Sequence, residues 1–483
     1  MIKNLFEGKS VKKIFGTAGA GKTTYLIKEC ENLFNEGVAP ERIAFVSFTN
    51  KSVDEMVERM LEKFKKFDKK QFQNFRTIHA MAFQSSEIKR VMSFYDLEKV
   101  AGLVGLEISK NYSIEDGAGT KKGDKAIAIE SLSRLRMVGL EEQWKACNFE
   151  DVPYRLVAGL SSQLKKYKKE NNVIDFTDML EKYSGGAINA DYFFIDEAQD
   201  LSPLQWNVLS QMTTSCKKIF IAGDDDQAIY NWAGADVNYI LNLKSEEEIV
   251  LTKSHRMPKN IYKLSRTILK KISVRKPKEF TPDKENGEIS RISSLSDLKL
   301  SKHKDYLFLV RNRHQLKEIK ERIEELGMPY KIMNKKSTDC DEVDAIKSWE
   351  SFRKNKEISF KEFENILQFA PTLKKYDRNK IPENLKVEWF KIMTAMKRDK
   401  MIYFRRFLEN EYRFSAEPRI KLSTIHQSKG GECENVIITT DVSYTTWKNI
   451  SSDDEHRVWY VAISRCKQNL IIIQEQSNLF YRI

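Results

Sequence analysis

The chain of 483 residues is long enough for roughly two to four domains, each able to bury its own core. Its 41% hydrophobic and 31% charged residues are ordinary for a soluble globular protein, and no apolar run reaches the ~18 residues of a membrane span. The surplus of 82 Lys and Arg over 69 Asp and Glu gives a net charge of +13, which indicates a polyanionic partner such as nucleic acid. The alternative is a lysine-rich composition spread evenly over a solvated surface.

The six cysteines are scattered along the chain, with no CxxC pair and no histidine at metal-binding spacing. This pattern favours reduced thiols in a cytoplasmic compartment and argues against a zinc module. The first residues, MIKNLFEGKSVKKIFG, lack the apolar segment of a signal peptide. We therefore expect an intracellular, cytoplasmic protein without membrane contact.

Short apolar runs separated by helical patterns predict an α/β core in the first half of the chain. The runs lie at 12–16, 42–49, 191–196, 217–224 and 248–254. Helical patterns at 23–34 and 52–67 separate the first of them. Continuous apolar strands that alternate with helices indicate a parallel sheet with helices on both faces.

A second α/β core is predicted by apolar runs at 306–311, 420–426, 435–440 and 469–474. Two long tracts carry helical patterns only, and each interrupts a series of strands, so we expect one helical insert in each core. The expected domains are 1–88 with 171–254, the insert 89–170, 255–335 with 415–483, and the insert 336–414. The polar segment 273–288 predicts an exposed connection.

The segment GTAGAGKTT follows a predicted strand and precedes a helix, the context in which GxxxxGK[ST] binds a nucleoside triphosphate. Its glycines let backbone N–H groups surround the phosphates, and the helix N-terminus adds positive potential. Lys22 would reach the β- and γ-phosphates, and the Thr23 hydroxyl would bind Mg²⁺. The predicted nucleotide-binding residues are Gly16, Thr17, Ala18, Gly19, Ala20, Gly21, Lys22, Thr23 and Thr24.

Two carboxylates follow the apolar strand in FFIDEAQD, at the edge of a parallel sheet where ligands bind. Asp196 suits Mg²⁺, and Glu197 suits orienting or deprotonating the attacking water, because phosphoryl transfer depends on positioning and charge. Alone, two such acids are more often a solvated loop or a helix cap. Beside a phosphate loop they predict a catalytic pair.

Four segments, DEAQD, GDDDQAIYNWAGA, TIHQSKGGECENV and WYVAISR, occur in the order and spacing of the motifs of superfamily 1 helicases. On these motifs the chain resembles the UvrD/Rep/PcrA type (superfamily 1A). The resemblance implies two RecA-like P-loop NTPase cores that sandwich ATP. The tract 336–414 is smaller than its counterpart in the family, so the chain resembles a compact, phage-encoded form that would act in the host cytoplasm.

The resemblance also implies roles at the nucleotide, with ATP and Mg²⁺ as the bound groups. Gln227 would sense the γ-phosphate, and Arg256 and Arg465 would act as arginine fingers. Thr23 and Asp196 would hold the metal. The implied catalytic residues are Lys22, Glu197, Gln227, Arg256 and Arg465.

Three further residues are implied at the base and the ribose. His255 stands where the family has a tyrosine that stacks on adenine, and an imidazole can stack in its place. Gly430 and Glu432 belong to KGGECENV, and Glu432 is expected near the ribose or the hinge.

Single-stranded DNA contacts are implied by FTNKSVDEM, TIHAMAF, RNRH and STIHQSKG, and DFTDML at 175–180 matches a further family signature. The implied DNA-binding residues are Phe48, Thr49, Asn50, Thr77, His79, Tyr230, Trp232, Arg311, Thr424 and His426. Aromatic rings suit this partner because every base offers a π-face, although an isolated aromatic side chain is more often a core residue. In GDDDQAIYNWAGAD we expect the acidic end beside ATP and Mg²⁺ and the aromatic end under the bases.

The function implied is an ATP-dependent DNA helicase that moves 3′ to 5′ on single-stranded DNA, unwinds tailed duplexes and works with replication or repair proteins. The polarity rests on the resemblance of DEAQD and DFTDML to the 3′–5′ branch. Two alternatives remain open, namely a translocase that removes bound proteins with little unwinding, and a non-motor DNA-binding accessory. An RNA-directed enzyme is disfavoured by the family but excluded by no residue.

Overall fold

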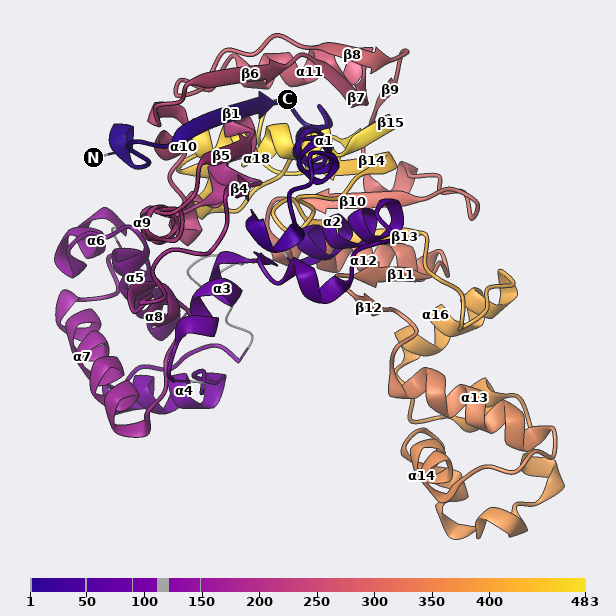
Figure 1. Cartoon of the computed structure of the whole chain (residues 1–483). Coiled ribbons are helices and arrows are strands. Elements are labelled where there is room, and N and C mark those ends of the chain that lie inside the picture. The colour runs from indigo at the N-terminus through magenta and orange to yellow at the C-terminus, as the bar shows by residue number, and fades with distance from the viewer. Residues whose placement is uncertain (1, 48–49, 89, 111–120, 148) are drawn as a thin grey trace. The chain divides into compact units, whose positions relative to one another are not determined.

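The computed structural model describes residues 2–47, 50–88, 90–110, 121–147 and 149–483 (Figure 1). The chain divides into two compact units, unit 1 (Met1–Glu285 with Ser451–Ser464) and unit 2 (Asn286–Ile450 with Arg465–Ile483). Each unit is built on a largely parallel sheet, which confirms the predicted α/β fold with two cores. Phe48 and Thr49, two of the predicted DNA contacts, lie outside the described residues.

Unit 1 contains a six-stranded parallel sheet in the order β3-β2-β4-β5-β1-β6. Its strands are β1 (Ser10–Gly16), β2 (Ile43–Val46), β3 (Phe75–Arg76), β4 (Tyr192–Ile195), β5 (Lys218–Gly223) and β6 (Glu247–Leu251). All five predicted apolar runs form strands of this sheet. The register pairs Phe15 with Gly223 and Ile195 with Ile221, so β1, β4 and β5 end at one edge. The loops that follow these strands therefore meet there.

Alternate side chains of these strands point to opposite faces of the sheet, as the pleat requires. Ile14 and Phe194 belong to a core with α1 and α2, whereas their neighbours Phe15 and Phe193 belong to a core with α3, α8 and α9. The covering helices are α1 (Lys22–Asn35), α2 (Asn50–Lys63), α3 (Ile78–Ser85), α8 (Phe176–Glu181) and α9 (Pro203–Met212). The continuous apolar runs of the sequence thus reflect burial on both faces.

The tract expected to be helical in unit 1 forms α4 (Phe94–Leu103), α5 (Lys122–Leu135), α6 (Leu140–Cys147) and α7 (Tyr154–Asn171). These helices enclose an apolar core of their own, which includes Val100, Ile129 and Leu160. In Figure 1 the α4–α7 tract lies to one side of the sheet of unit 1.

Ion pairs join this helical tract to α8. Arg134 at the end of α5 contacts Asp175 at 2.8 Å and Asp178 at 2.7 Å, and Lys168 of α7 contacts both carboxylates at 2.7 Å. The two cations hold the pKa of Asp175 well below its usual range against the opposing effect of burial. Asp175 and Asp178 of the DFTDML signature therefore connect the start of α8 to α5 and α7 through a cluster of ion pairs, called the clamp below.

More than half of the residues of segment 273–288 are exposed, as its composition predicts, but the segment also carries buried charges. The Lys278 side chain is completely buried and Arg275 is mostly buried, because both pair with the carboxylates at 224–226. After them, β8 (Thr281–Lys284) pairs in parallel with β7 (Lys253–Pro258). The burial of these charges was not predicted because the acids that neutralise them lie about fifty residues away in the chain.

Residues 255–285 and α18 (Asp453–Ser464), both expected in the second core, belong to unit 1. Helix α11 (Lys259–Leu269) packs along α18. Arg457 of α18 also donates a 3.0 Å hydrogen bond to the backbone carbonyl of Asp225. The four functional domains expected from the sequence remain a prediction.

Unit 2 contains a seven-stranded sheet in the order β12-β11-β13-β10-β14-β15-β9, in which β11 and β12 pair antiparallel and the other neighbours are parallel. Its strands are β9 (Glu288–Ile292), β10 (Tyr306–Val310), β11 (Tyr330–Ile332), β12 (Lys335–Lys336), β13 (Ile420–Thr424), β14 (Cys433–Thr439) and β15 (Cys466–Ile473). The four predicted runs form β10, β13, β14 and β15. The edge strands escaped prediction because they are short and charged.

The helical tract of unit 2 shares its core with one face of this sheet. Its helices are α13 (Asp341–Arg353), α14 (Phe360–Phe369), α15 (Trp389–Ile392) and α16 (Arg398–Glu409). Trp349 and Phe407 belong to the same buried cluster as Phe308 of β10. The Tyr403 hydroxyl donates to the carbonyl of Met328 at 3.2 Å, which further ties α16 to the sheet.

The six cysteines are all free thiols, as their scattered positions predict. Within the part of the chain that the structure describes, no helix combines the length and apolar character needed to cross a membrane.

Candidate functional site

The phosphate loop lies between the end of β1 and the start of α1. Gly19 and Gly21 adopt φ angles of 72° and 81°, a region that glycine enters at little cost. A Cβ atom on Gly19 would lie only 2.4 Å from the Cβ of Arg256. Glycine at this position therefore allows β7 to approach the loop.

Two side chains of the loop fit a triphosphate. Lys22 is buried, and its Nζ lies 3.1 Å from the carbonyl oxygen of Gly16 and 3.3 Å from that of Thr17. The Thr17 hydroxyl is fully buried and has no hydrogen-bond partner among the described residues. Leaving such a group unpaired costs about 1–3 kcal/mol, and a phosphate oxygen would supply the missing acceptor.

The next two side chains fit Mg²⁺. The Thr23 hydroxyl donates a 2.7 Å hydrogen bond to Asp196 Oδ2. Asp196 is buried, and burial, followed by the adjacent charge of Glu197, raises its pKa to about 6. A hydroxyl and a carboxylate oxygen at this distance are the hard ligands that Mg²⁺ prefers, and a cation would offset the burial of the carboxylate.

Glu197 follows directly and adopts a left-handed backbone conformation with a φ of 53°. Left-handed backbone is unfavourable for a residue with a Cβ and is concentrated at functional sites. The turn places its N–H 3.0 Å from Asp196 Oδ1. This hydrogen bond joins the first two acids of DEAQD directly after the strand.

Strand β7 lies along the phosphate loop. The N–H of His255 donates to the carbonyl of Gly19 at 3.0 Å, and Arg256 Nη1 lies 3.5 Å from the carbonyl of Ser464 in α18. The structure thus brings Arg256 to the phosphate loop, as the predicted finger role requires. The His255 ring is largely exposed, with Nδ1 2.8 Å from Asp283 Oδ2.

The three acids of GDDDQ pair with two cations of the segment 273–288. The ammonium group of Lys278 lies 3.2 Å from Asp224 and 3.0 Å from Asp226 and also contacts Asp225. Arg275 forms two further 2.7 Å bonds with Asp226. The carboxylates are close enough together to hold a metal ion, but a buried lysine lies among them instead. The acids therefore form an internal ion-pair cluster, and the expectation that this end of the loop lies beside ATP and Mg²⁺ stays a prediction.

Gln227, at the end of the acidic run, is buried with its Nε2 2.5 Å from Asp224 Oδ2. The predicted contact of Gln227 with the γ-phosphate remains compatible with the structure.

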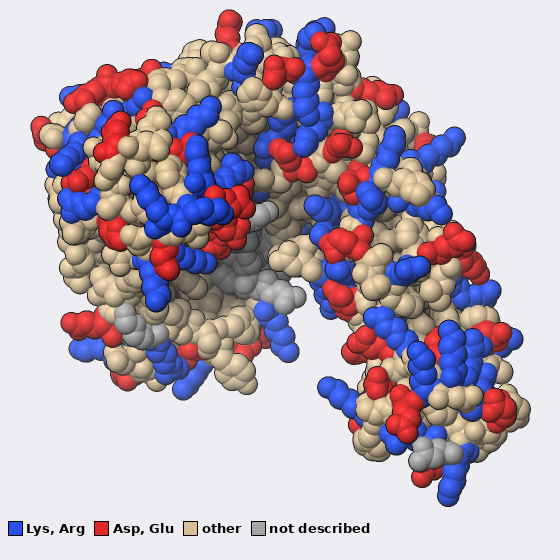
Figure 2. Space-filling view, turned by 45° about the vertical axis from the view of Figure 1, so that its right-hand side comes forward, with Lys and Arg blue, Asp and Glu red and all other residues tan. Residues whose placement is uncertain are grey.

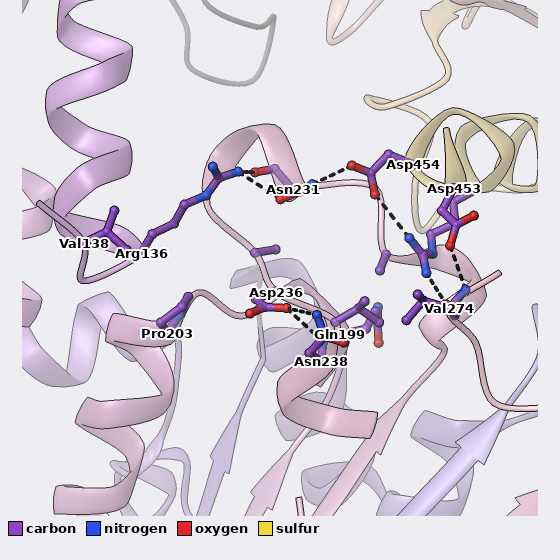
Figure 3. Close-up of a pocket in the computed structure, with 14 residues that line it drawn as sticks. Arg136, Val138, Gln199, Pro203, Asn231, Asp236, Asn238, Val274, Asp453 and Asp454 are labelled. Carbon is purple, nitrogen blue, oxygen red and sulfur yellow. Dashed lines mark hydrogen bonds and ion pairs between the residues drawn. The ribbon is translucent and has the colours of Figure 1, made fainter. Parts of the chain in front are cut away.

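The aromatic end of the same loop is less buried. The Tyr230 and Trp232 rings lie 5.9 Å apart at 65°, and both side chains are partly exposed. Between them, Asn231 accepts two hydrogen bonds from Arg136, at 2.7 Å and 2.9 Å, and donates one to Asp454 (Figure 3). Arg136, Asn231 and Asp454 border a cavity of about 460 Å³. The aromatic turn is thus attached both to the α4–α7 tract and to α18.

The other predicted DNA contacts described in unit 1 lie at helix N-termini. Asn50 is exposed at the first position of α2. Thr77 caps α3 by accepting from the N–H of Ala80 at 3.3 Å, which leaves its hydroxyl proton for a phosphate. The His79 ring lies edge-on to Phe176 at 6.1 Å, and burial lowers its pKa to about 4, so the ring is neutral at pH 7.

In unit 2, three predicted DNA contacts lie together where β10 and β13 end. Arg311 follows the residue of β10 that pairs with Thr424. Thr424 accepts from the N–H of Gln427 at 3.3 Å. Burial, then the positive charges of Arg311 and Lys429, lowers the pKa of His426 to about 3.

Gly430, Glu432 and Arg465 lie where β14 and β15 begin. Gly430 has a φ of 82°, and Glu432 pairs with Lys467 at 3.0 Å. Arg465 is buried and donates to the carbonyl of Gly431 at 3.2 Å. The structure brings these three residues together in unit 2, and their roles at a nucleotide remain predictions.

Comparison with known proteins gives these motifs a family. The UvrD/REP helicase N-terminal domain matches residues 3–248, just over half of the chain. The chain belongs to the UvrD/REP helicase family. The UvrD-like helicase C-terminal domain matches residues 340–477.

Relatives of this UvrD/REP family member include "ATP-dependent DNA helicase PcrA" of Staphylococcus aureus, which is 26% identical over 304 residues, 57% of this chain and 40% of that protein. The "Probable DNA helicase II homolog" of Mycoplasma pneumoniae is 27% identical over 315 residues, 58% of this chain and 42% of that protein. The matched region thus covers only about two fifths of each relative. A solved structure, "The structure of PRRSV helicase", aligns over 99% of this chain and 55% of that chain with a TM-score of 0.36 and 10% identity, too low to inform on the fold.

Sequence reasoning missed several side chains at the motifs of this UvrD/REP protein. Phe176 is 64% exposed beside His79, and its place within DFTDML could have signalled it. Tyr444 and Trp447 are exposed and stacked at 6.4 Å and 17°, directly after β14. Lys278 carried no signal, because nothing in a polar segment distinguishes a buried lysine from a solvated one.

Proposed function

We propose that this chain is an ATP-dependent DNA helicase that moves 3′ to 5′ along single-stranded DNA and unwinds duplex DNA. The observation that carries the proposal is one sheet edge in unit 1. There the phosphate loop, the Thr23–Asp196 pair and Arg256 lie together, and Arg256 comes close enough to require glycine at position 19. The names of the relatives, which are DNA helicases, support DNA as the partner.

The side chains have distinct tasks in ATP hydrolysis. Lys22 binds the β- and γ-phosphates, and Arg256 adds a second positive charge as charge develops on the γ-phosphate. Glu197 orients the attacking water and accepts its proton, and Gln227 donates a hydrogen bond to the γ-phosphate. Mg²⁺, held by Thr23 and Asp196, supplies further charge neutralisation when bound.

Other nucleotide contacts belong to the proposal on the resemblance alone. These are Arg465 as a second arginine finger, Glu432 and Gly430 near the ribose, and His255 at the adenine. The expected domain boundaries and the 3′–5′ direction rest on the same ground.

DNA binding is proposed to be independent of sequence. The net charge of +13 supports phosphate contacts that weaken as salt rises, and Figure 2 shows Lys and Arg side chains interspersed with Asp and Glu on the face in view. Tyr230 and Trp232 would stack on bases, only a few residues from Gln227. The short segment from Gln227 to Trp232, which several hydrogen bonds hold in place, would thus connect the state of the nucleotide to the binding of DNA.

ATP hydrolysis measured with and without single-stranded DNA, followed by unwinding of duplexes with a 3′ or a 5′ tail, tests this function. We expect DNA-stimulated hydrolysis and unwinding from the 3′ tail. Absence of stimulation would contradict a motor, and unwinding from 5′ tails alone would contradict the direction. Displacement of a bound protein from single strands without unwinding would establish the translocase instead, and stimulation by RNA alone would replace the DNA partner.

A further inference from the structure

Asp224 connects the two residues expected to act at the γ-phosphate. On one side, Gln227 Nε2 donates to Asp224 Oδ2 at 2.5 Å. On the other, the N–H of Asp224 donates to Gln199 Oε1 at 2.9 Å, and Gln199 Nε2 donates to Glu197 Oε2 at 2.5 Å. Glu197 and Gln227, on different loops of the sheet edge, are therefore linked through two residues with no solvent exposure, by the side chain of Gln199 and by the backbone N–H and carboxylate of Asp224.

Lys278 holds the Asp224 carboxylate of this link in place. Its ammonium group lies 3.2 Å from Asp224 Oδ1, the oxygen that does not contact Gln227, and its side chain has no solvent exposure. With one oxygen held by Lys278 and the other by Gln227, the carboxylate has little freedom to rotate. The N–H of Asp226 also donates to Asp224 Oδ1, at 3.3 Å.

Gly223, next to this link, leaves room for the side-chain amide of Gln199. A Cβ atom on Gly223 would lie 2.8 Å from Oε1 of Gln199 and 2.5 Å from Cδ1 of Ile240. A side chain at position 223 would therefore push the Gln199 amide away from Asp224. Glycine at the end of β5 is required for the same contact that joins the two loops.

We propose that Gln199, Asp224 and Lys278 are positioning residues that hold Glu197 and Gln227 in one arrangement for attack on the γ-phosphate. The inference rests on the proposed ATP hydrolysis and assigns the acidic run a task within it. None of the three needs to touch the nucleotide. Because misplacing a reacting group by about 1 Å can cost about 100-fold in rate, the link should affect kcat far more than the binding of ADP.

The chain offers a matched pair of variants. Asp224 and Asp226 are both fully buried and both lie about 3 Å from Lys278, but the carboxylate of Asp226 pairs with Arg275 rather than with Gln227. In Asp224→Asn the amide oxygen stays toward Lys278, so the NH₂ group meets the NH₂ group of Gln227 and the hydrogen bond is lost. Asp226→Asn removes the same charge beside Lys278 but leaves the hydrogen bonds that join Glu197, Gln199, Asp224 and Gln227.

The experiment measures kcat and KM for ATP, affinities for Mg²⁺ complexes of ADP and adenylyl imidodiphosphate, and melting temperature. We expect Asp224→Asn to lower kcat about 10- to 100-fold relative to Asp226→Asn, to lose preference for the triphosphate analogue over ADP, and to bind ADP as the control does. Equal kcat values and equal analogue preferences in the two variants would overturn the inference.

Two further outcomes have a defined meaning, namely a variant that does not fold and a wild-type protein that does not hydrolyse ATP. If Asp224→Asn fails to fold, Gln199→Met, which keeps the length of the side chain but removes the amide, must show the same loss of kcat with unchanged ADP affinity, and a wild-type kcat overturns the inference. If the wild-type protein binds the analogue without hydrolysing ATP, the proposed function fails. The inference then stands only if Asp224→Asn, unlike Asp226→Asn, lowers the analogue preference.

Discussion

Gly19 and Arg256 approach each other so closely that the first atom of any side chain on Gly19 would lie 2.4 Å from the Cβ of Arg256. The two residues are far apart in sequence, and the contact brings a guanidinium group to the loop that is expected to bind phosphates. This close approach and the positive φ of 72° are two separate reasons for glycine at position 19.

Replacing this glycine tests the contact. Gly19→Ala should displace β7 from the loop and lower the rate of ATP hydrolysis at least about tenfold, because Arg256 would move by more than 1 Å. Gly21→Ala is the control, since it has a similar positive φ of 81° but no atom nearer than 3.9 Å to the new Cβ. Both variants place a Cβ atom on backbone with a positive φ, which costs about 1–2 kcal/mol. Similar activities in the two variants would show that only backbone conformation matters.

The clamp around Arg134 should dominate the attachment of the α4–α7 tract. Arg134→Met removes the cation beside the buried Glu130 carboxylate and leaves Asp178 with Lys168 alone, which we expect to lower the free energy of unfolding by about 3–5 kcal/mol in urea denaturation. Arg59→Met removes an exposed pair with Glu55 and should cost less than about 1 kcal/mol. If Arg134→Met lowers the free energy of unfolding no more than Arg59→Met does, the ion pairs of Arg134 do not hold the α4–α7 tract in place.

Two partly buried histidines should make stability rise with pH between about 4 and 6.5. Burial lowers the pKa of His79 to about 4 and, with neighbouring cations, that of His426 to about 3, whereas both titrate near 6.5 when unfolded. In this range the unfolded chain binds more protons than the folded chain, so stability falls as the pH falls. Asp196, with its raised pKa, acts in the opposite direction.

Comparison of variants isolates this effect. The double variant His79→Gln, His426→Gln should show a flatter rise in melting temperature between pH 4.5 and 7 than the wild type, with little difference between the two slopes above pH 7. An unchanged slope would mean that these rings titrate normally in the folded protein.

Trp232 should couple hydrolysis to DNA. Trp232→Ala should keep the basal ATPase rate but weaken binding to single-stranded DNA by about 1–3 kcal/mol per lost stacking contact and remove movement along the strand. Fluorescence anisotropy with a labelled oligonucleotide measures the binding. Tyr95→Ala, which alters a ring that is 79% exposed on α4, is the control and should bind as the wild type. Loss of the folded state in Trp232→Ala would identify Trp232 as a core residue instead.

The strands and the phosphate loop could be predicted from the sequence because their causes are local. Five apolar runs became the sheet of unit 1, and GxxxxGK[ST] between a strand and a helix formed the expected turn. The edge placement of Asp196 followed from strand order alone, since parallel strands end together.

The acidic run shows where such reasoning stops. The sequence indicates three acids before Gln227, but their partner Lys278 lies about fifty residues later in a segment whose composition is typical of exposed chain. Neutralisation by a distant, buried cation is a tertiary contact without a local pattern. The same limit applied to Arg136, whose contact with Asn231 joins two tracts of unit 1.

The most direct test of the proposed motor compares wild type and Lys22→Ala for ATP hydrolysis with and without single-stranded DNA, together with DNA binding at two salt concentrations. The wild type should hydrolyse ATP faster when DNA is added. Lys22→Ala should lose hydrolysis in both conditions while its salt-sensitive DNA binding is largely kept, because Lys22 belongs to the phosphate loop and not to the proposed DNA contacts. Hydrolysis by Lys22→Ala at the wild-type rate, or a wild-type rate that DNA does not change, would contradict an ATP-driven motor on DNA.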